Sequence, residues 1–329
     1  MTLAFTICSN NYLAQAKTLL DSVNVHHPEF KTFIFLVDEP NEIIDYNFFK
    51  PAEVIVVDAT IVNDYKKLVN RYSILELNSA VRPFVFQYLA DKFPKADRLY
   101  YLDPDICVYD RLDYLDTLLE TEDIIITPHF LTPVPLDGLT PGENLAFNYG
   151  VYNLGFLAIN PTSDNVKNFL TWWGERTSRF CYIDTANGYF VDQIWFNIVP
   201  VFFKRVHILR HSGYNMAYWN LHERVISNYQ DDGKISLKSG EHLVFYHFSL
   251  WSYFQPKELS RKLSRFNFNN RPELHKLFKD YYLQLKKNRM EEFGKIPCRL
   301  GYKKSKNKSS IKKILSPGVN LMKRVWEKL

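Results

Sequence analysis

Short apolar segments alternate with amphipathic ones through the first two thirds of the chain, and this alternation constrains the fold more than any other feature. Runs rich in β-branched and aromatic residues predict eight strands, at 5–8, 32–37, 53–57, 98–102, 123–127, 155–159, 205–209 and 243–248. Helical spacing lies between several of them, at 12–25, 73–90, 163–179 and 191–198. Such alternation is typical of α/β proteins, so we expect a mostly parallel sheet flanked by helices.

The predicted strand 98–102 runs directly into two carboxylates, Asp103 and Asp105, on either side of Pro104. Strand side chains at positions i and i+2 point the same way, so the two carboxylates can converge on one point. Pro104 lacks a backbone donor and predicts the end of the strand, where ligands commonly bind in open α/β sheets. Two hard oxygen donors suit a divalent cation such as Mg²⁺ or Mn²⁺. The alternative interpretation is a surface Asp-Pro turn.

The composition is that of a globular protein with a ligand cleft. Of the 329 residues, 46% are hydrophobic and 16% are aromatic, and aromatic side chains also line pockets for planar rings and sugars. The four cysteines are far apart, which argues against a zinc ribbon or a redox pair and favours a reducing compartment. No signal peptide and no membrane-spanning run is recognisable, so we expect a cytoplasmic protein.

The net charge of +5 is unevenly distributed. Residues 299–329 hold ten basic side chains and one acidic side chain, so the rest of the chain carries a net charge of about −4. This balance argues against a nucleic-acid-binding core. Apolar residues are interspersed among the lysines of 311–329, which favours an amphipathic tail on an anionic membrane surface. The alternative is a solvated tail without a partner.

Several short motifs follow one another in a fixed order. They are Phe5-Thr6-Ile7-Cys8-Ser9-Asn10-Asn11-Tyr12, Asn78-Ser79-Ala80-Val81-Arg82-Pro83, Tyr100-Tyr101-Leu102-Asp103-Pro104-Asp105, Tyr152-Asn153-Leu154-Gly155, Asp192-Gln193-Ile194-Trp195 and His247-Phe248-Ser249. Over roughly residues 3–255 this order resembles the GT-A glycosyltransferases, in particular family eight, the glycogenin and bacterial lipopolysaccharide galactosyltransferase type. The resemblance implies a GT-A fold, a Rossmann-like α/β sheet with a C-terminal helical extension.

The resemblance also implies a nucleotide-diphosphosugar donor, usually a UDP-sugar, and a Mn²⁺ (or Mg²⁺) ion. Asp103 and Asp105 match the metal-binding pair, and His247 matches a late histidine that completes the ligand set. Without the resemblance, His247 would be interpreted as a hydrogen-bonded core histidine.

Three residues match positions that contact the nucleotide in this family. Tyr12 matches the aromatic residue that stacks on the base, and Asn10 is placed to bond the base edge. Arg82 matches a basic residue near the diphosphate. The alternatives are a helix-packing tyrosine, a helix-capping asparagine and a surface ion pair.

Asn153, Asp192 and Gln193 match residues at the reacting sugar, and the family implies retention of configuration. Asp192 is a candidate nucleophile if it reaches the anomeric carbon. Otherwise the leaving phosphate takes the acceptor proton in a same-face route, and Gln193 and Asn153 orient the sugar. The alternative for Asp192 is a first-turn helix carboxylate.

One motif departs from the family. The late histidine is often followed by Gly-x-Lys-Pro-Trp, whose lysine reaches the diphosphate, but neither that glycine nor that lysine follows His247. Lys257 is the predicted substitute, with Arg261 as the alternative. The aromatic- and asparagine-rich segment 214–224 is interpreted as part of the donor or acceptor wall, or as a loop packed on the sheet.

Together these patterns predict three parts: a catalytic domain at 1–255, a helical extension at 256–298 and a basic amphipathic tail at 299–329. The expected function is sugar transfer from a nucleotide sugar to a glycan or glycolipid acceptor in bacterial surface polysaccharide synthesis, such as lipopolysaccharide, at the inner face of the membrane. The alternatives are a sugar nucleotidyltransferase and a non-catalytic sugar- or lipid-binding module.

Overall fold

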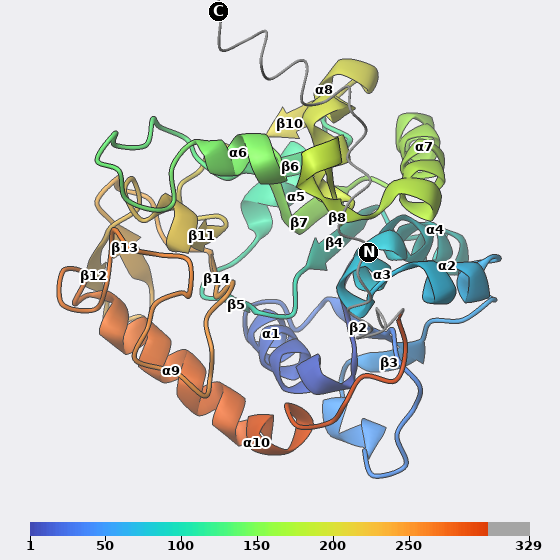
Figure 1. Ribbon diagram of the computed structural model, residues 1–329, viewed down its shortest axis with the longest axis horizontal. Coiled ribbons are helices and arrows are strands. Elements are labelled where there is room, and N and C mark those ends of the chain that lie inside the picture. The colour runs from blue at the N-terminus through green and yellow to red at the C-terminus, as the bar shows by residue number, and fades with distance from the viewer. Residues whose placement is uncertain (302–329) are drawn as a thin grey trace, which may run out of the picture.

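A seven-stranded sheet forms the centre of the computed structural model, which describes residues 1–301 (Figure 1). The strand order is β10-β6-β7-β4-β1-β2-β3. The strands are β1 (Thr2–Cys8), β2 (Lys31–Leu36), β3 (Glu53–Val56), β4 (Arg98–Leu102), β6 (Ile124–Pro128), β7 (Tyr152–Ile159) and β10 (Val206–Ile208). Only β7 runs antiparallel to its neighbours, β4 and β6. The expected mostly parallel α/β sheet is confirmed.

The central strands are mostly apolar because both faces of the sheet are covered. Alternate residues of β1 enter two different cores: Ala4 and Cys8 pack on one face, and Leu3, Phe5 and Ile7 pack on the other. Helices α1 (Leu13–His26) and α9 (Leu274–Lys287) contribute to the first core, and α4 (Arg82–Lys92) and α7 (Asp164–Phe180) to the second.

The helix expected over 73–90 is two helices, α3 (Ile74–Ala80) and α4. Ser73 caps α3 through a reciprocal bond pair with Glu76. The second helix starts afresh because Pro83 lies in its first turn, where the missing N–H is tolerated. The other short helices are α2 (Tyr65–Arg71), α5 (Asp113–Leu118), α6 (Asn144–Tyr149), α8 (Val199–Phe202) and α10 (Met290–Phe293).

A small second sheet, with strand order β11-β14-β5, lies beside the end of β4. Its strands are β5 (Ile106–Val108), β11 (Met216–Ala217) and β14 (Phe245–His247). Strand β14 was expected, but β5 and β11 are too short to give a sequence pattern. Two further ribbons are formed by β8 (Ile183–Asp184) with β9 (Tyr189–Phe190), and by β12 (Ile226–Tyr229) with β13 (Ile235–Leu237).

The predicted extension, 256–298, is helical only in its second half, where α9 and α10 pack against α1. Tyr281 of α9 stacks on Phe248 with ring centroids 3.7 Å apart, so this segment shares a core with the sheet. The boundary at residue 255 stays a prediction. Nearly all of the predicted tail lies outside the described residues. Within residues 1–301, no helix combines the length and the apolar character needed to cross a bilayer.

Candidate active site

The turn Asp103-Pro104-Asp105 joins β4 to β5 at the carboxyl end of the central sheet. The backbone N–H of Asp103 donates to the Gly155 carbonyl of β7 (2.7 Å), and the N–H of Ile106 donates back to the Asp103 carbonyl (3.0 Å). The two carboxylates therefore converge because the chain turns between two strands. The expectation that strand alternation aligns them was wrong, since neither Pro104 nor Asp105 belongs to a strand.

His247 ends β14 and faces both carboxylates. Its Nε2 lies 3.1 Å from Asp105 Oδ1 and 3.7 Å from Asp103 Oδ2. One ligand atom from each of the three residues lies within 4.8 Å of the others. Burial lowers the pKa of His247, but the carboxylates of Asp105 and Asp103 outweigh it and raise that pKa above its usual value. Two carboxylates and one imidazole suit Mn²⁺ or Mg²⁺, so these residues fit the ion that the resemblance implies.

The small sheet and β7 fix the imidazole. His247 pairs with Ile106 of β5, the residue that follows Asp105, so the register of this sheet brings histidine and carboxylate together. On β7, a Cβ at Gly155 would overlap the Cε1 atom of His247. Glycine is required there because the ring packs directly on the backbone.

Arg82 is buried and joins two acidic side chains. Its Nη2 donates to Asp103 Oδ1 (2.9 Å), while Nη1 donates to Asp192 Oδ2 (3.1 Å) and to the Leu154 carbonyl (3.1 Å). The guanidinium also lies 4.5 Å from the ring centroid of Tyr101. The alternative interpretation of Arg82, a surface ion pair, is thus wrong: the ion pair is buried and links the metal-binding turn to Asp192.

Asp192 is completely buried at the wall of the main cavity. Its pKa is raised to about 6, because burial disfavours the charge more strongly than Arg82 favours it. Its Oδ1 atom has no hydrogen-bond partner among the described residues. Asp192 precedes a 3₁₀ turn, Gln193–Ile198, rather than the expected α-helix.

Gln193 and Asn153 form a chain of paired amides. Gln193 Oε1 accepts from the Leu154 backbone (2.9 Å) and from Asn153 Nδ2 (3.3 Å), and Gln193 Nε2 donates to the Tyr149 carbonyl (2.7 Å). Asn153 Nδ2 also lies 3.4 Å from His129 Nε2. These contacts fix both amides, and both side chains line the cavity.

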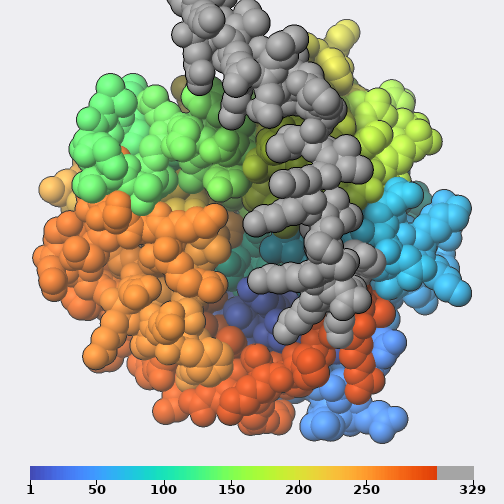
Figure 2. Space-filling model, in the orientation of Figure 1, coloured from blue at the N-terminus to red at the C-terminus, as the bar shows by residue number. Residues whose placement is uncertain are grey.

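The cavity, of about 530 Å³, brings most of the predicted site residues together. Tyr12, Arg82, Asp103, Asp105, Asn153, Asp192, Gln193 and His247 all line it. Tyr218 and Trp219 of the segment 214–224 line it too, and so do residues that the sequence did not single out, among them His129 and Cys298. Figure 2 shows the green segment around residue 140 beside the orange segment around residue 265, and Arg265 pairs with Asp137 between them (2.7 Å).

Asn10 and Lys257 do not line the cavity. Asn10 is buried. Its Nδ2 donates to the Glu39 carbonyl (2.8 Å) and its Oδ1 accepts from the Tyr46 hydroxyl (3.2 Å), so it joins the loop after β1 to the segment after β2. Lys257 lines a separate pocket of about 370 Å³ with Phe268 and Tyr282. The basic residue of this region that reaches the main cavity is Lys262, whose Nζ lies 5.2 Å from the Tyr149 ring centroid.

No known protein-family profile matches the chain. It is 25% identical over 289 residues to the uncharacterized protein YfnF of Bacillus subtilis (strain 168), a match covering 85% of this chain and 91% of that protein. The apo structure of the bifunctional glycosyltransferase WbbM matches with 15% identity and a TM-score of 0.51, over 86% of this chain and 49% of that one. The galactosyltransferase LgtC, solved with donor and acceptor sugar analogues, matches with 16% identity and a TM-score of 0.49, over 86% and 95% of the two chains.

The likeness to WbbM shows a shared fold. The chain therefore has the GT-A type of glycosyltransferase fold that the ordered motifs predicted. Membership of family eight stays a prediction.

Proposed function

We propose that this protein is a metal-dependent glycosyltransferase that moves a sugar from a nucleotide-diphosphosugar, a UDP-sugar, to a hydroxyl of a glycan or lipid-linked acceptor. The observation that carries the proposal is the convergence of Asp103, Asp105 and His247 at the wall of one cavity. Tyr12 and Asp192, with its Arg82 partner, line the same cavity. A ligand with a base, a diphosphate and a sugar matches this combination of aromatic, metal-binding and acidic groups.

Each group of residues has a role in this proposal. Tyr12, with 43% of its surface exposed, offers a ring face on which a nucleobase stacks. Asp103, Asp105 and His247 hold the cation, which when bound neutralises negative charge on the diphosphate leaving group. Arg82 adds a permanent positive charge behind Asp103.

The sugar end consists of Asn153, Asp192 and Gln193. Gln193 Oε1 already accepts two hydrogen bonds, which hold this side chain in place to orient the sugar. Asp192 keeps one oxygen on Arg82 and has its other oxygen unpaired, which suits a bond to a sugar hydroxyl. We therefore favour the same-face route with retention, in which the acceptor hydroxyl gives its proton to the departing phosphate oxygen.

A thermal-shift panel of nucleotide sugars with Mn²⁺, repeated with EDTA, tests the donor without needing an acceptor. The expected result is a rise in melting temperature with one UDP-sugar that EDTA removes. An assay of free UDP release then separates the alternatives. Pyrophosphate-dependent turnover would indicate a nucleotidyltransferase, and binding without any turnover would indicate a non-catalytic module.

The acceptor is proposed to be a glycan or glycolipid of a bacterial surface polysaccharide, at the inner membrane face. The support is the run of basic and apolar residues in 299–329, which is typical of an interfacial segment. Flotation of the full chain and of a chain ending at residue 301 with anionic liposomes tests this step. Equal binding of both would exclude the tail as the anchor.

A further inference from the structure

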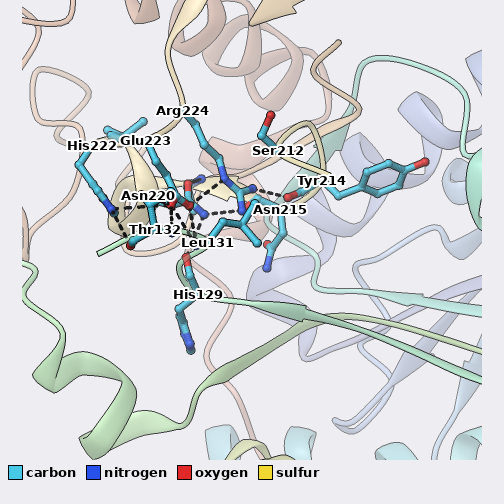
Figure 3. Close-up of polar contacts among 12 residues, drawn as sticks. His129, Leu131, Thr132, Ser212, Tyr214, Asn215, Asn220, His222, Glu223 and Arg224 are labelled. Atoms are coloured by element: carbon cyan, nitrogen blue, oxygen red, sulfur yellow. Dashed lines mark hydrogen bonds and ion pairs between the residues drawn. The ribbon is translucent and has the colours of Figure 1, made fainter. Parts of the chain in front are cut away.

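Asn215 is a completely buried amide between His247 and Asn153. Its Oδ1 lies 3.3 Å from Nδ1 of His247. Its Nδ2 lies 3.0 Å from Thr127 Oγ1 and 3.1 Å from Asn153 Oδ1. Figure 3 shows Asn215 among the polar side chains of residues 212–224 that gather beside His129. The residue thus connects the candidate metal ligand to the amides at the sugar end.

The hydrogen-bond donors and acceptors around Asn215 determine the orientation of its amide. The hydroxyl of Thr127 donates its only proton to the Asn153 carbonyl (3.3 Å), so its oxygen accepts from Asn215. Asn153 Oδ1 already accepts from the Gly155 backbone (3.0 Å), and it takes the second amide proton of Asn215. Both protons of Asn215 are therefore used, and its oxygen must face His247. An acceptor at that point requires a proton on Nδ1 of His247.

We propose that Asn215 is the positioning residue that sets His247 for metal binding. A neutral imidazole with its proton on Nδ1 has its lone pair on Nε2, the nitrogen that faces Asp105 and Asp103. Metal-binding histidines commonly donate their other N–H to such a partner, which fixes the tautomer and the ring orientation. The inference rests on the proposed function, because it assumes that these three residues hold a cation.

The backbone around Asn215 is built to keep the amide in place. Asn215 has a φ of 58°, a left-handed conformation that asparagine tolerates better than most residues. Its carbonyl accepts from Asn220 Nδ2 (3.0 Å), and the same amide donates to the His129 carbonyl (3.2 Å). The fully buried Arg224 donates to the carbonyl of the preceding residue, Tyr214.

The imidazole itself is held from two further sides. The Trp219 ring lies 5.2 Å from it at an interplanar angle of 87°. Gly155 contacts it from β7. With these contacts in place, the bond to Asn215 keeps a proton on Nδ1, so that Nε2 is the nitrogen that would give up its proton to a cation.

Titration of the full chain with Mn²⁺ by calorimetry, without any sugar nucleotide, tests the inference. Asn215→Gly removes the amide but keeps the left-handed backbone, which glycine adopts freely. The expected result is a Kd about 10- to 100-fold higher than in the native protein. Asn215→Asp keeps an acceptor for Nδ1–H but loses both amide donors. It should therefore recover much of the Mn²⁺ affinity without recovering thermal stability.

This split between affinity and stability distinguishes positioning from a merely structural role. A structural role predicts that Asn215→Asp is at least as damaging as Asn215→Gly in both measurements. The matched control is Asn288→Gly, which removes another buried amide, one that donates to Thr18 Oγ1 (2.9 Å) and Asp21 (3.2 Å) outside the cavity lining. This variant should lose stability but bind Mn²⁺ as the native protein does.

The same Mn²⁺ titration of Asp105→Asn tests the metal site itself, on which both this inference and the proposed function depend. If Asp105→Asn binds Mn²⁺ as tightly as the native protein, the metal site and the proposed function both fail. If Asp105→Asn loses binding while Asn215→Gly keeps the native Kd within twofold, the metal site stands and the role of Asn215 is overturned.

Discussion

The two walls of the cavity are built in different ways. The strand-end wall, formed by residues 7–12, 74–82 and 101–105, consists of strand ends and helix starts whose positions follow from regular hydrogen bonding. The loop wall is carried by the segments 127–132, 149–154 and 214–224, which supply His129, Tyr149, Asn153, Leu154, Tyr218 and Trp219 to the lining. These segments rely much more on side chains that bond to distant backbone. Glu223, for example, accepts from the backbone N–H groups of Leu131 (2.9 Å) and Thr132 (2.6 Å), as Figure 3 shows.

The difference has an energetic consequence. In the strand-end wall, one side chain can be replaced without releasing the backbone, since the sheet holds it. In the loop wall, each buried side chain that is removed leaves unpaired carbonyls or N–H groups, which cost about 1–3 kcal/mol each. Substitutions in the first wall should therefore affect chemistry more than stability, and substitutions in the second wall should affect both.

The largest effect is expected from Asp105→Asn in the strand-end wall. This change removes a charged ligand but keeps the shape of the side chain, so sugar transfer should fall about 1,000-fold or more, roughly 4 kcal/mol. The free energy of unfolding should change little. Turnover of the UDP-sugar found in the panel measures the first, and urea denaturation measures the second. Asp113→Asn, an exposed carboxylate paired with Arg111, is the control. Equal turnover in native and Asp105→Asn proteins would refute the metal assignment.

Arg224→Met tests the loop wall. The guanidinium is buried, donates to the Tyr214 carbonyl and lies 3.4 Å from Glu223 Oε1, so its loss should cost about 3 kcal/mol of unfolding free energy. Burial lowers the pKa of Arg224 to about 10, and Glu223 opposes the shift.

The matched control for Arg224 is Arg111→Met. Arg111 pairs with Glu29 (2.9 Å) and Asp113 (2.7 Å), but about half of its side chain is exposed (48%). Solvent screens these pairs, so we expect a loss below about 1 kcal/mol. Similar urea midpoints for the two variants would contradict the distinction between the walls.

Acidification should weaken the loop wall through His129. Burial lowers the pKa of His129 to about 4 and outweighs the hydrogen bond from Nδ1 to the Val151 carbonyl (3.2 Å), which opposes the shift; Nε2 faces the Asn153 amide (3.4 Å). A second proton on the ring, at Nε2, would point at the N–H donor of Asn153. The unfolded chain takes up this proton near pH 6.5 and the folded chain only near pH 4, so stability falls as pH falls between these values.

The expected cost from His129 is about 2 kcal/mol between pH 7 and pH 5, at about 1.4 kcal/mol per pH unit. Urea denaturation of the native protein and of His129→Gln across this range measures it, and the variant should show the flatter profile. His247 contributes in the opposite direction, because its raised pKa adds stability at low pH that is lost as pH rises through it. If the unfolding free energies of the native protein and of His129→Gln depend on pH in the same way, His129 is not the source of the loss of stability.

The contrast between the walls also explains what the sequence could predict. All eight expected strands are present, because strands buried on both faces give continuous apolar runs. Asp103 and Asp105 could be recognised because they stand at the end of such a run, whereas His247 was assigned from the family resemblance. The bonds of the loop wall join residues as far apart as Leu131 and Glu223, and side-chain-to-backbone contacts of this kind leave no periodic pattern.

The segment 214–224 carried one usable signal, its density of asparagine and aromatic residues. Asn215 and Asn220 could have been recognised there as candidate backbone-capping amides.

The prediction that Lys257 reaches the diphosphate was misled by its position in the sequence, because Lys257 does not line the cavity. After β14 the chain turns at Leu250, which has a φ of 59°, and the first part of the predicted helical extension, 257–264, forms turns and bends instead. Distance along the sequence from His247 was therefore no guide to distance from the cavity.

The smallest effect is expected from Tyr12→Ala at the nucleotide part of the strand-end wall. The ring lines the cavity and is partly exposed, so its removal should raise the Kd for UDP about tenfold, within the roughly 1–3 kcal/mol of one base–aromatic stack. Tyr114→Ala is the control, because that ring is equally exposed (46%, against 43% for Tyr12) but does not line the cavity. Calorimetric titration with UDP and Mn²⁺ measures both. If Tyr12→Ala and Tyr114→Ala bind UDP alike, the base does not stack on Tyr12, and the strand-end wall then recognises only the diphosphate.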